Sequence, residues 1–323
     1  MFEEMKIPVL SNIMLVVRRW ATPSVLTVVS IVALAWAASA AQPKGAAAKA
    51  GGPEKLTSAG GVAHVYKQVG TMELRLYVFT PRERKPGERR PAILFFLGGG
   101  FVGGDPSSYV DQCKHFAARG LVAITAAYRL KGQENANVPD SCMDGKSAVR
   151  WVRAHADELG IEPGRLAVGG GSAGGFISVF TTFIEKFNDP NDDLNTSCVP
   201  NALVLFNPGV EATEEKARQK GGEEAVGLVK AISPLGHVCK DAPPTIIFHG
   251  TADTTVPFES ILRFQKKMQE LGNRCEVVSY EGRKHSFFNR EPDKTDVIQK
   301  SDAFLTGLGY LKENPAAPQE VKK

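Results

Sequence analysis

RLAVGGGSAGG, residues 165–175, is the stretch that decides the fold. Residues 165–168 are suited to a short strand, and a helix-forming run follows at 176–183. Between them, Ser172 is the centre of a G-x-S-x-G pattern with Gly170 and Gly174. A serine nucleophile needs such a turn from strand to helix, because its hydroxyl must stand exposed above the end of the sheet. Glycine removes the side chains that would clash there, so the stretch predicts an elbow with Ser172 as nucleophile.

Length and composition are those of one large globular domain. The chain has 323 residues, of which 43% are hydrophobic and 23% charged. Once the ends are set aside, about 250 residues remain, which is enough for a substantial single core. We therefore expect one catalytic domain over residues 59–311. The formal net charge is +4, from 39 basic and 35 acidic residues, and a charge this small and dispersed predicts no nucleic-acid partner.

The N-terminal segment has the layout of a signal peptide. A basic pair at 18–19 precedes an apolar run at 25–37, and the small residues Ala-Ser-Ala follow at 38–40. The apolar run is shorter than the roughly 20 residues of a membrane span. Residues 1–40 are therefore predicted to be a cleaved signal, the mature protein to be secreted or periplasmic, and no stable membrane insertion to remain after cleavage. An uncleaved anchor is the alternative.

Two further segments have compositions that cannot bury much surface. Residues 41–58 are rich in Ala, Gly, Pro and Lys, which predicts a flexible linker. Residues 312–323 form a Pro/Ala/Lys tail, which predicts disorder. The true start of the chain, Met1 or Met14, stays open.

Runs that are apolar throughout alternate with helical segments along most of the chain. Strands covered on both faces have this composition, and the apolar runs lie at 91–97, 121–127, 165–168, 202–206 and 245–249, with a last strand at 276–280. The helical segments lie at 109–119, 140–159, 172–187, 258–271 and 294–307. Residues 62–69 and 72–79 instead read as two antiparallel strands. The sequence therefore predicts an α/β fold: a mostly parallel central sheet, helices on both faces and an N-terminal antiparallel hairpin.

Residues 207–240 interrupt this alternation with a polar helical piece. The segment could lie over the mouth of the active site as a lid, or it could be a surface excursion without contact to substrate. Both readings stay open.

An acid and a histidine follow the serine in the order that this fold requires. Asp253 comes just after the apolar run 245–249, and His285 lies in the loop after the last strand. The order Ser, Asp, His is the one expected for a serine triad on a sheet of this kind. We expect Ser172 to attack the acyl carbon, His285 to take and return the proton, and Asp253 to orient the imidazole.

Other titratable residues compete for these roles. His249 ends a predicted strand close to Asp253, and local hydrogen bonding is its expected function. Asp144 and Asp157 lie on a predicted helix and are expected to face water or to cap it.

A second glycine-rich stretch, LGGGFVGG (97–104), follows the first fully apolar strand. Backbone N–H groups in such a loop can point at a developing oxyanion, so the amides of Gly99, Gly100 and Ala173 are the predicted oxyanion hole. The same stretch formally fits the dinucleotide pattern G-x-G-x-x-G, but no acidic residue ends the next strand. No spacing of His, Cys and carboxylate residues suggests a metal site. We therefore predict no cofactor and no metal.

Five cysteines in an exported chain favour disulfides. Cys198 and Cys239 precede two strands that would be parallel neighbours, and Cys113 and Cys142 lie on successive helices. We expect these two pairs, with Cys275 left over, although spacing alone does not fix the connectivity. Buried free thiols are the alternative.

Taken together, these motifs make the chain similar to α/β-hydrolase esterases, in the branch related to hormone-sensitive lipase and bacterial acetyl esterases. The resemblance is carried by LGGGFVGG (97–104), AYRL (127–130), residues 147–175, HGTADTTVP (249–257) and YEGRKHSFF (280–288). That family usually has a histidine at the position of Leu97. The histidine is described as shaping the glycine loop, so we expect catalysis to survive its replacement by leucine. For an exported bacterial member, the resemblance implies an acetyl esterase acting on acetylated polysaccharide.

The function expected from the sequence is an exported serine carboxylic-ester hydrolase that forms an acyl-enzyme on a small-molecule or polysaccharide ester. One alternative is a serine peptidase of prolyl-oligopeptidase type, because HGTADTTVP also occurs in such domains. Those domains usually carry a propeller upstream, which the mature N-terminus is too short to supply. A non-catalytic binding module is the other alternative, and it would require a lost triad. Acyl and alcohol specificity and the oligomeric state stay open.

Overall fold

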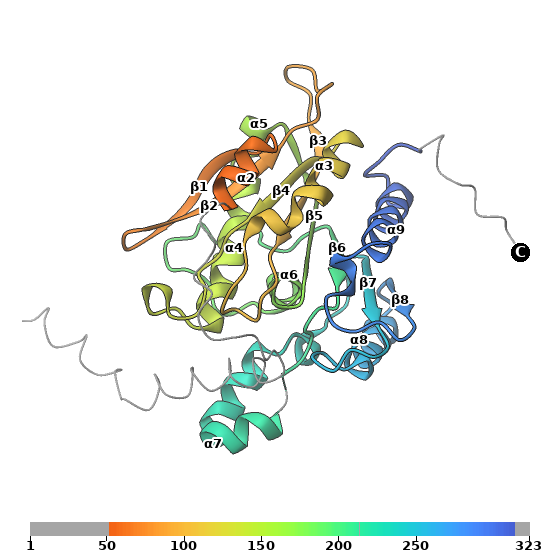
Figure 1. Cartoon of the computed structure of the whole chain (residues 1–323). Coiled ribbons are helices and arrows are strands. Elements are labelled where there is room, and N and C mark those ends of the chain that lie inside the picture. Colours follow the sequence, from red (N-terminus) through yellow and green to blue (C-terminus); the bar gives the residue numbers. More distant parts are fainter. Residues whose placement is uncertain (1–51, 213, 314–323) are drawn as a thin grey trace, which may run out of the picture.

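The computed structural model describes residues 52–212 and 214–313 (Figure 1). The predicted signal peptide and most of the predicted linker lie outside the described residues, as do residues 314–323 of the predicted tail. Across the described ranges, no helix is both long enough and apolar enough to cross a membrane.

A sheet of eight strands forms the centre of the described chain, in the order β1-β2-β4-β3-β5-β6-β7-β8. The strands are β1 (Val62–Val69), β2 (Met72–Phe79), β3 (Arg90–Phe96), β4 (Val122–Ala126), β5 (Ile161–Gly171), β6 (Ala202–Phe206), β7 (Thr245–Gly250) and β8 (Cys275–Tyr280). β2 pairs antiparallel with β1 and with β4, and every other pairing is parallel. The predicted fold class, with its N-terminal hairpin, is confirmed.

Helices cover both faces of this sheet (Figure 1). One core contains residues of α4 (Val138–Ala154), α6 (Ala173–Phe183), α7 (Glu214–Ile232) and α8 (Phe258–Glu270). The other core contains residues of α2 (Gly52–Ser58), α3 (Val110–Ala118) and α9 (Asp293–Gly307). The remaining short helices are η1 (Pro106–Tyr109), η2 (Gln133–Asn135), α5 (Ala156–Leu159), η3 (Pro234–His237) and η4 (Phe287–Asn289).

The central strands are apolar throughout because each supplies both cores. In β3, Leu94 and Phe96 pack in the first core, whereas Ile93 and Phe95 pack in the second. Successive side chains of a strand point to opposite faces, so a strand with helices on both sides has no position left for a polar residue.

The predicted linker ends earlier than expected. Residues 52–58 form α2, and the Leu56 side chain is 0% exposed in the second core. A single leucine among Ala, Gly, Pro and Lys is a weak sequence signal for a packed helix. Leu56 is buried because α2 packs against one face of the sheet, which the local sequence does not reveal.

Asp144 does not face water as expected. Its side chain is buried and accepts hydrogen bonds from Arg129 Nε at 2.7 Å and Nη2 at 2.8 Å, and Lys67 Nζ lies 2.7 Å from its Oδ1. Lys67 also pairs with Asp189 at 2.6 Å. Buried charges persist only when they are paired in this way, and the cluster ties β1 to α4 and to the segment after α6.

The predicted disulfides are wrong, since all five cysteines are free. Cys113 belongs to α3 in one core and Cys142 to α4 in the other, so the sheet separates them. Cys198 is buried with its Sγ 3.5 Å from Thr181 O, whereas Cys239 is exposed. Successive helices of a doubly wound sheet can lie on opposite faces, which cysteine spacing does not reveal.

We expect a thiol assay of the denatured, unreduced chain to count five reactive groups. In the native protein, exposed Cys239 should react first. Cys113 should stay unreactive, because burial raises the pKa of its thiol and hides the sulfur. The same count after reduction is the control, and a count of one or three before reduction would contradict the structure.

Candidate active site

Ser172 occupies a strained turn between β5 and α6. Its φ is 53° and its ψ is −115°, a region that non-glycine residues enter only when surrounding contacts hold them there. The Ser172 N–H donates to Phe206 O at 3.0 Å, and the Ser172 carbonyl accepts from Phe176 N–H at 2.9 Å. The neighbouring strand β6 and the first turn of α6 therefore fix the elbow from both sides, with Ser172 partly exposed.

Two glycines let this elbow lie against the end of β3. A Cβ added to Gly170 would lie 2.5 Å from Phe96 O, and one added to Gly174 would lie 2.0 Å from the same oxygen. Both separations are far below any real contact, so only glycine fits at these two positions. The G-x-S-x-G spacing is thus a requirement of backbone packing as well as of the turn.

The structure brings the three predicted side chains into one hydrogen-bonded chain. His285 Nε2 lies 2.9 Å from Ser172 Oγ, and His285 Nδ1 lies 2.7 Å from Asp253 Oδ2. An ionised carboxylate can only accept, so Nδ1–H donates to Asp253, and Nε2 is left to accept the proton of the serine hydroxyl. The Asp253 side chain is 0% exposed and that of His285 is 19% exposed, which leaves the reacting end of the chain open to a substrate.

Backbone groups hold the buried carboxylate in place. Asp253 Oδ1 accepts the N–H groups of Thr255 and Val256, each at 2.9 Å. These bonds leave Oδ2 for His285. Asp253 follows β7 by three residues, so the turn that ends the strand also orients the acid.

His249 has the local role that the sequence predicted. It is completely buried, and its Nε2 lies 2.9 Å from Val256 O and 3.4 Å from Asp253 Oδ2. Burial holds the pKa of His249 below its ordinary value. The residue is a neutral donor beneath the turn that carries Asp253.

Asn207 is a site residue that the sequence analysis missed. Its Oδ1 accepts the N–H of Ser286 at 3.1 Å, and its own N–H donates to Phe248 O at 2.8 Å. Asn207 is fully buried and directly follows β6, so it ties the loop of His285 to the sheet. The available signal was its place immediately after an apolar strand, where functional residues of open α/β sheets collect.

The second glycine loop lies beside the elbow. A Cβ on Gly98 would lie 2.9 Å from Gly171 O and 3.6 Å from Ser172 Cβ. Gly99 and Gly100 have φ values of 123° and 63°, and the loop turns back so tightly that a Cβ on Gly99 would lie 2.0 Å from Gly103 O. Ala173 begins α6 next to Ser172, so the three predicted oxyanion donors belong to two segments that adjoin the serine.

The electrostatics at this end of the sheet favour negative charge. The N-terminus of α6, with its unsatisfied N–H groups, starts directly after Ser172.

Within 52–212 and 214–313, no three His, Cys, Asp or Glu side chains are grouped as a metal site would need.

The sheet order, the strained serine elbow and the helix behind it together define an α/β-hydrolase. More specifically, the sequence model of the BD-FAE family matches residues 76–268, and the chain belongs to that family.

Proteins similar to this chain are esterases. A structure of Thermogutta terrifontis esterase 2 with propionate bound has 42% sequence identity and a TM-score of 0.74, covering 79% of this chain and 97% of that one. Esterase LipC of Mycobacterium tuberculosis is 27% identical over 64% of this chain and 55% of its own length. A probable isoprenylcysteine alpha-carbonyl methylesterase of Arabidopsis thaliana is 25% identical over 67% of this chain and 50% of its own length. This chain spans about half the length of these two relatives.

Replacing Gly174 by alanine should unfold the elbow or displace it. The added methyl would overlap Phe96 O, and overpacking of this kind costs about 3 kcal/mol of the free energy of unfolding. Urea unfolding of Gly174→Ala measures the loss. Gly227→Ala is the matched control, because a Cβ there meets nothing within 4 Å in α7; equal effects of the two changes would contradict the packing argument.

The His249→Gln variant should be less sensitive to acid than the wild type. Because the pKa of folded His249 lies below its ordinary 6.5, the unfolded chain binds the proton first as the pH falls through that value. The wild type therefore loses stability below pH 6.5, by at most about 1.4 kcal/mol per pH unit from this group. Urea unfolding between pH 7.5 and 5.5 tests this.

His237→Gln serves as the control for that series, since His237 is exposed. An acid-induced loss of stability in His249→Gln that equals the wild-type loss would rule out His249 as its source.

Proposed function

We propose that the chain is a serine carboxylic-ester hydrolase in which Ser172, His285 and Asp253 form the catalytic triad. The observation that carries this proposal is the position of His285, with Nε2 2.9 Å from Ser172 Oγ and Nδ1 2.7 Å from Asp253 Oδ2. The serine on its elbow is the nucleophile, and the imidazole that joins it to the buried acid is the base.

In the first half-reaction, Ser172 Oγ attacks the ester carbonyl carbon while His285 Nε2 accepts the hydroxyl proton. The resulting imidazolium is stabilised by Asp253, whose own position is fixed by two backbone N–H groups. The tetrahedral intermediate collapses, His285 gives the proton to the alcohol oxygen, and the acyl group stays on Ser172. Water then attacks this acyl-enzyme while His285 accepts its proton; the bond between the acyl carbon and Ser172 Oγ breaks, His285 returns the proton to Oγ, and the carboxylic acid leaves.

Backbone amides of Gly99, Gly100 and Ala173 would stabilise the negative oxygen of both tetrahedral intermediates. Their two segments adjoin Ser172, and the positive end of α6 adds to the same field. Losing one such donor typically costs about 3 kcal/mol of barrier.

The acyl group that we propose is short, and acetyl groups on carbohydrate are the proposed natural substrate. Support comes from structures of Thermogutta terrifontis esterase 2 with propionate and with butyrate bound. In this chain, the rings of Phe101 and Phe176 meet edge to face at 5.9 Å, close along the chain to Gly100 and Ser172 respectively. Two bulky buried rings at these positions are consistent with a small acyl pocket.

Export to the periplasm or beyond is part of the same proposal and rests on the sequence of residues 1–40. The intact mass of the protein recovered from the exported fraction tests it. Mature protein that begins after Ala40 is the expected result, and recovery of the unprocessed chain from the cytoplasm would contradict it.

Hydrolysis of p-nitrophenyl esters from acetate upward is the decisive assay. We expect kcat/KM to fall with chain length, and Ser172→Ala to lose at least about a thousandfold in kcat. Ser178→Ala, on the same helix with its hydroxyl bonded to Gly174 O, is the matched control. Equal inactivity of wild type and Ser172→Ala on every ester, or faster cleavage of a p-nitroanilide amide, would defeat the proposal.

Paraoxon provides a second readout that needs no substrate, since a structure of Thermogutta terrifontis esterase 2 is phosphorylated by this compound. We expect one phosphoryl adduct, located by peptide mass on Ser172, and none in Ser172→Ala.

A further inference from the structure

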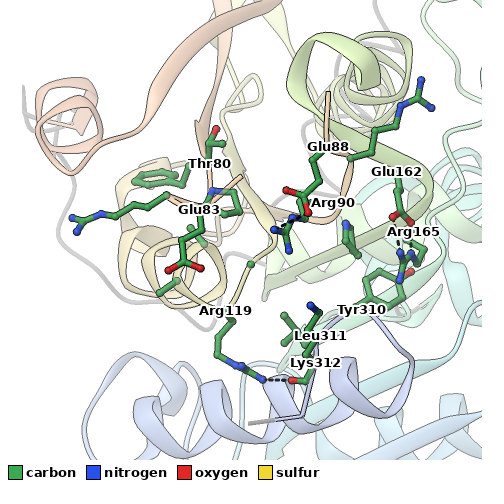
Figure 2. A pocket seen from close by; sticks show the side chains of 18 of the residues that line it. Thr80, Glu83, Glu88, Arg90, Arg119, Glu162, Arg165, Tyr310, Leu311 and Lys312 are labelled. Atoms are coloured by element: carbon green, nitrogen blue, oxygen red, sulfur yellow. Dashed lines mark hydrogen bonds and ion pairs between the residues drawn. The ribbon is translucent and has the colours of Figure 1, made fainter. Parts of the chain in front are cut away.

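A cavity of about 1260 Å³ lies at the opposite end of the sheet from Ser172. Figure 2 shows side chains that line it. It is lined by Arg90 at the start of β3 and by Glu162 and Arg165 in the first half of β5, whereas Ser172 follows the last residue of β5. The rest of the lining comes from the end of α3 and the residues after it (114 and 117–120), from the segment after α9 (309–312), and from residues 59–60, 79–83 and 88–91. The cavity is therefore separate from the candidate active site and takes no part in the proposed ester hydrolysis.

Two of the carboxylates in the lining are already neutralised. Glu88 pairs with Arg90 at 2.9 Å, and Glu162 forms a two-bond ion pair with Arg165 (Figure 2). These pairs form part of the wall, and they leave little negative charge free to repel an anion.

Three cations of the lining have no such partner. Arg82, Lys114 and Lys312 make no ion pair and no side-chain hydrogen bond with residues 52–212 or 214–313. Each is exposed, and they come from the loop after β2, from α3 and from the segment after α9. Glu83 is the single acid of the lining in the same state within these ranges, so the unpaired charge is predominantly positive.

The wall also contains buried donors without acceptors. Tyr310 is 7% exposed, and its hydroxyl has no hydrogen-bond partner among the described residues. Arg90 Nε is buried and unpartnered within the same ranges. Burial raises the pKa of Tyr310 to about 12, so the hydroxyl keeps its proton at neutral pH. Native proteins leave few buried donors unsatisfied, and both donors belong to residues of this one lining.

We propose that this cavity is a binding site for a small molecule that carries two or more phosphate or carboxylate groups. The unpaired cations supply long-range attraction, and Arg90 and Tyr310, each with a buried donor that has no partner among the described residues, belong to the same lining. Phosphates and carboxylates share this anionic chemistry, and the two probes below distinguish them.

Calorimetric titration of the full chain with sodium tripolyphosphate and, separately, with citrate tests the site. We expect at least one probe to bind with a dissociation constant below about 1 mM at low ionic strength. The probe that binds more tightly identifies phosphate or carboxylate as the natural group. Failure of both probes to bind would overturn the proposal.

A triple variant, Arg82→Ala with Lys114→Ala and Lys312→Ala, should weaken binding at least about tenfold. The matched control removes the same charges elsewhere, with Lys240→Ala, Lys267→Ala and Arg290→Ala, all exposed and outside the lining. The control should bind like the wild type. Equal loss in both triple variants would show attraction by net charge alone and would overturn a built site.

Tyr310→Phe tests the buried donor with little risk to folding, because it removes only an unpartnered hydroxyl. We expect weaker binding with an unchanged or higher Tm, and unchanged affinity would remove Tyr310 from the site. Ser172→Ala should bind both probes as the wild type does, so the outcome is independent of the ester-hydrolysis proposal.

Discussion

The close approach of two backbones at Phe96 is the constraint on which the rest of the structure depends. A Cβ added to Gly170 would lie 2.5 Å from the Phe96 carbonyl oxygen, and one added to Gly174 would lie 2.0 Å from it, so neither position accepts a side chain. With those side chains absent, the chain can leave β5, turn through Ser172 at a φ of 53° and start α6 at once. Backbone hydrogen bonds to Phe206 and Phe176 keep Ser172 in this strained conformation. A serine exposed above the sheet, with a helix N-terminus behind it, is the direct product of this packing.

The other two members of the hydrogen-bonded chain depend on the parallel sheet. β6, β7 and β8 run side by side in one direction, so their carboxyl ends meet at the edge where Ser172 stands. Asp253 is fixed by the turn after β7, and the loop of His285 is fixed by Asn207 at the end of β6. The Ser172 elbow is thus held by the neighbouring strand β6, Asp253 by its own turn after β7, and the loop of His285 by Asn207 two strands away, which keeps the geometry rigid.

Charge is distributed differently at the two ends of the molecule. At the carboxyl ends of the strands, the one buried carboxylate of the site is balanced by His285 and by backbone N–H groups. At the amino ends, ion pairs form the wall of a large cavity and three cations remain unpaired within the described ranges. The buried pairing of Asp144 with Arg129 and Lys67 lies apart from both and holds elements of one face together. Buried ion pairs hold elements of this protein together, whereas the unpaired cations line the cavity that we propose as a ligand site.

The sequence by itself determined the order of strands and helices, the elbow and the three residues of the hydrogen-bonded chain. It could do so because these features depend on local rules: apolar runs for strands covered on both faces, glycine where a Cβ does not fit, and polar residues just after strands. The tertiary structure decided what depends on which elements become neighbours. Cys113 and Cys142 lie on opposite faces of the sheet, Asp144 is buried against Arg129 and Lys67, and Asn207 reaches the loop of His285. The basic cavity likewise gathers Arg82, Lys114 and Lys312 from segments far apart in the chain. Such contacts arise from packing between distant segments, and a linear pattern records the residues without recording which of them will meet.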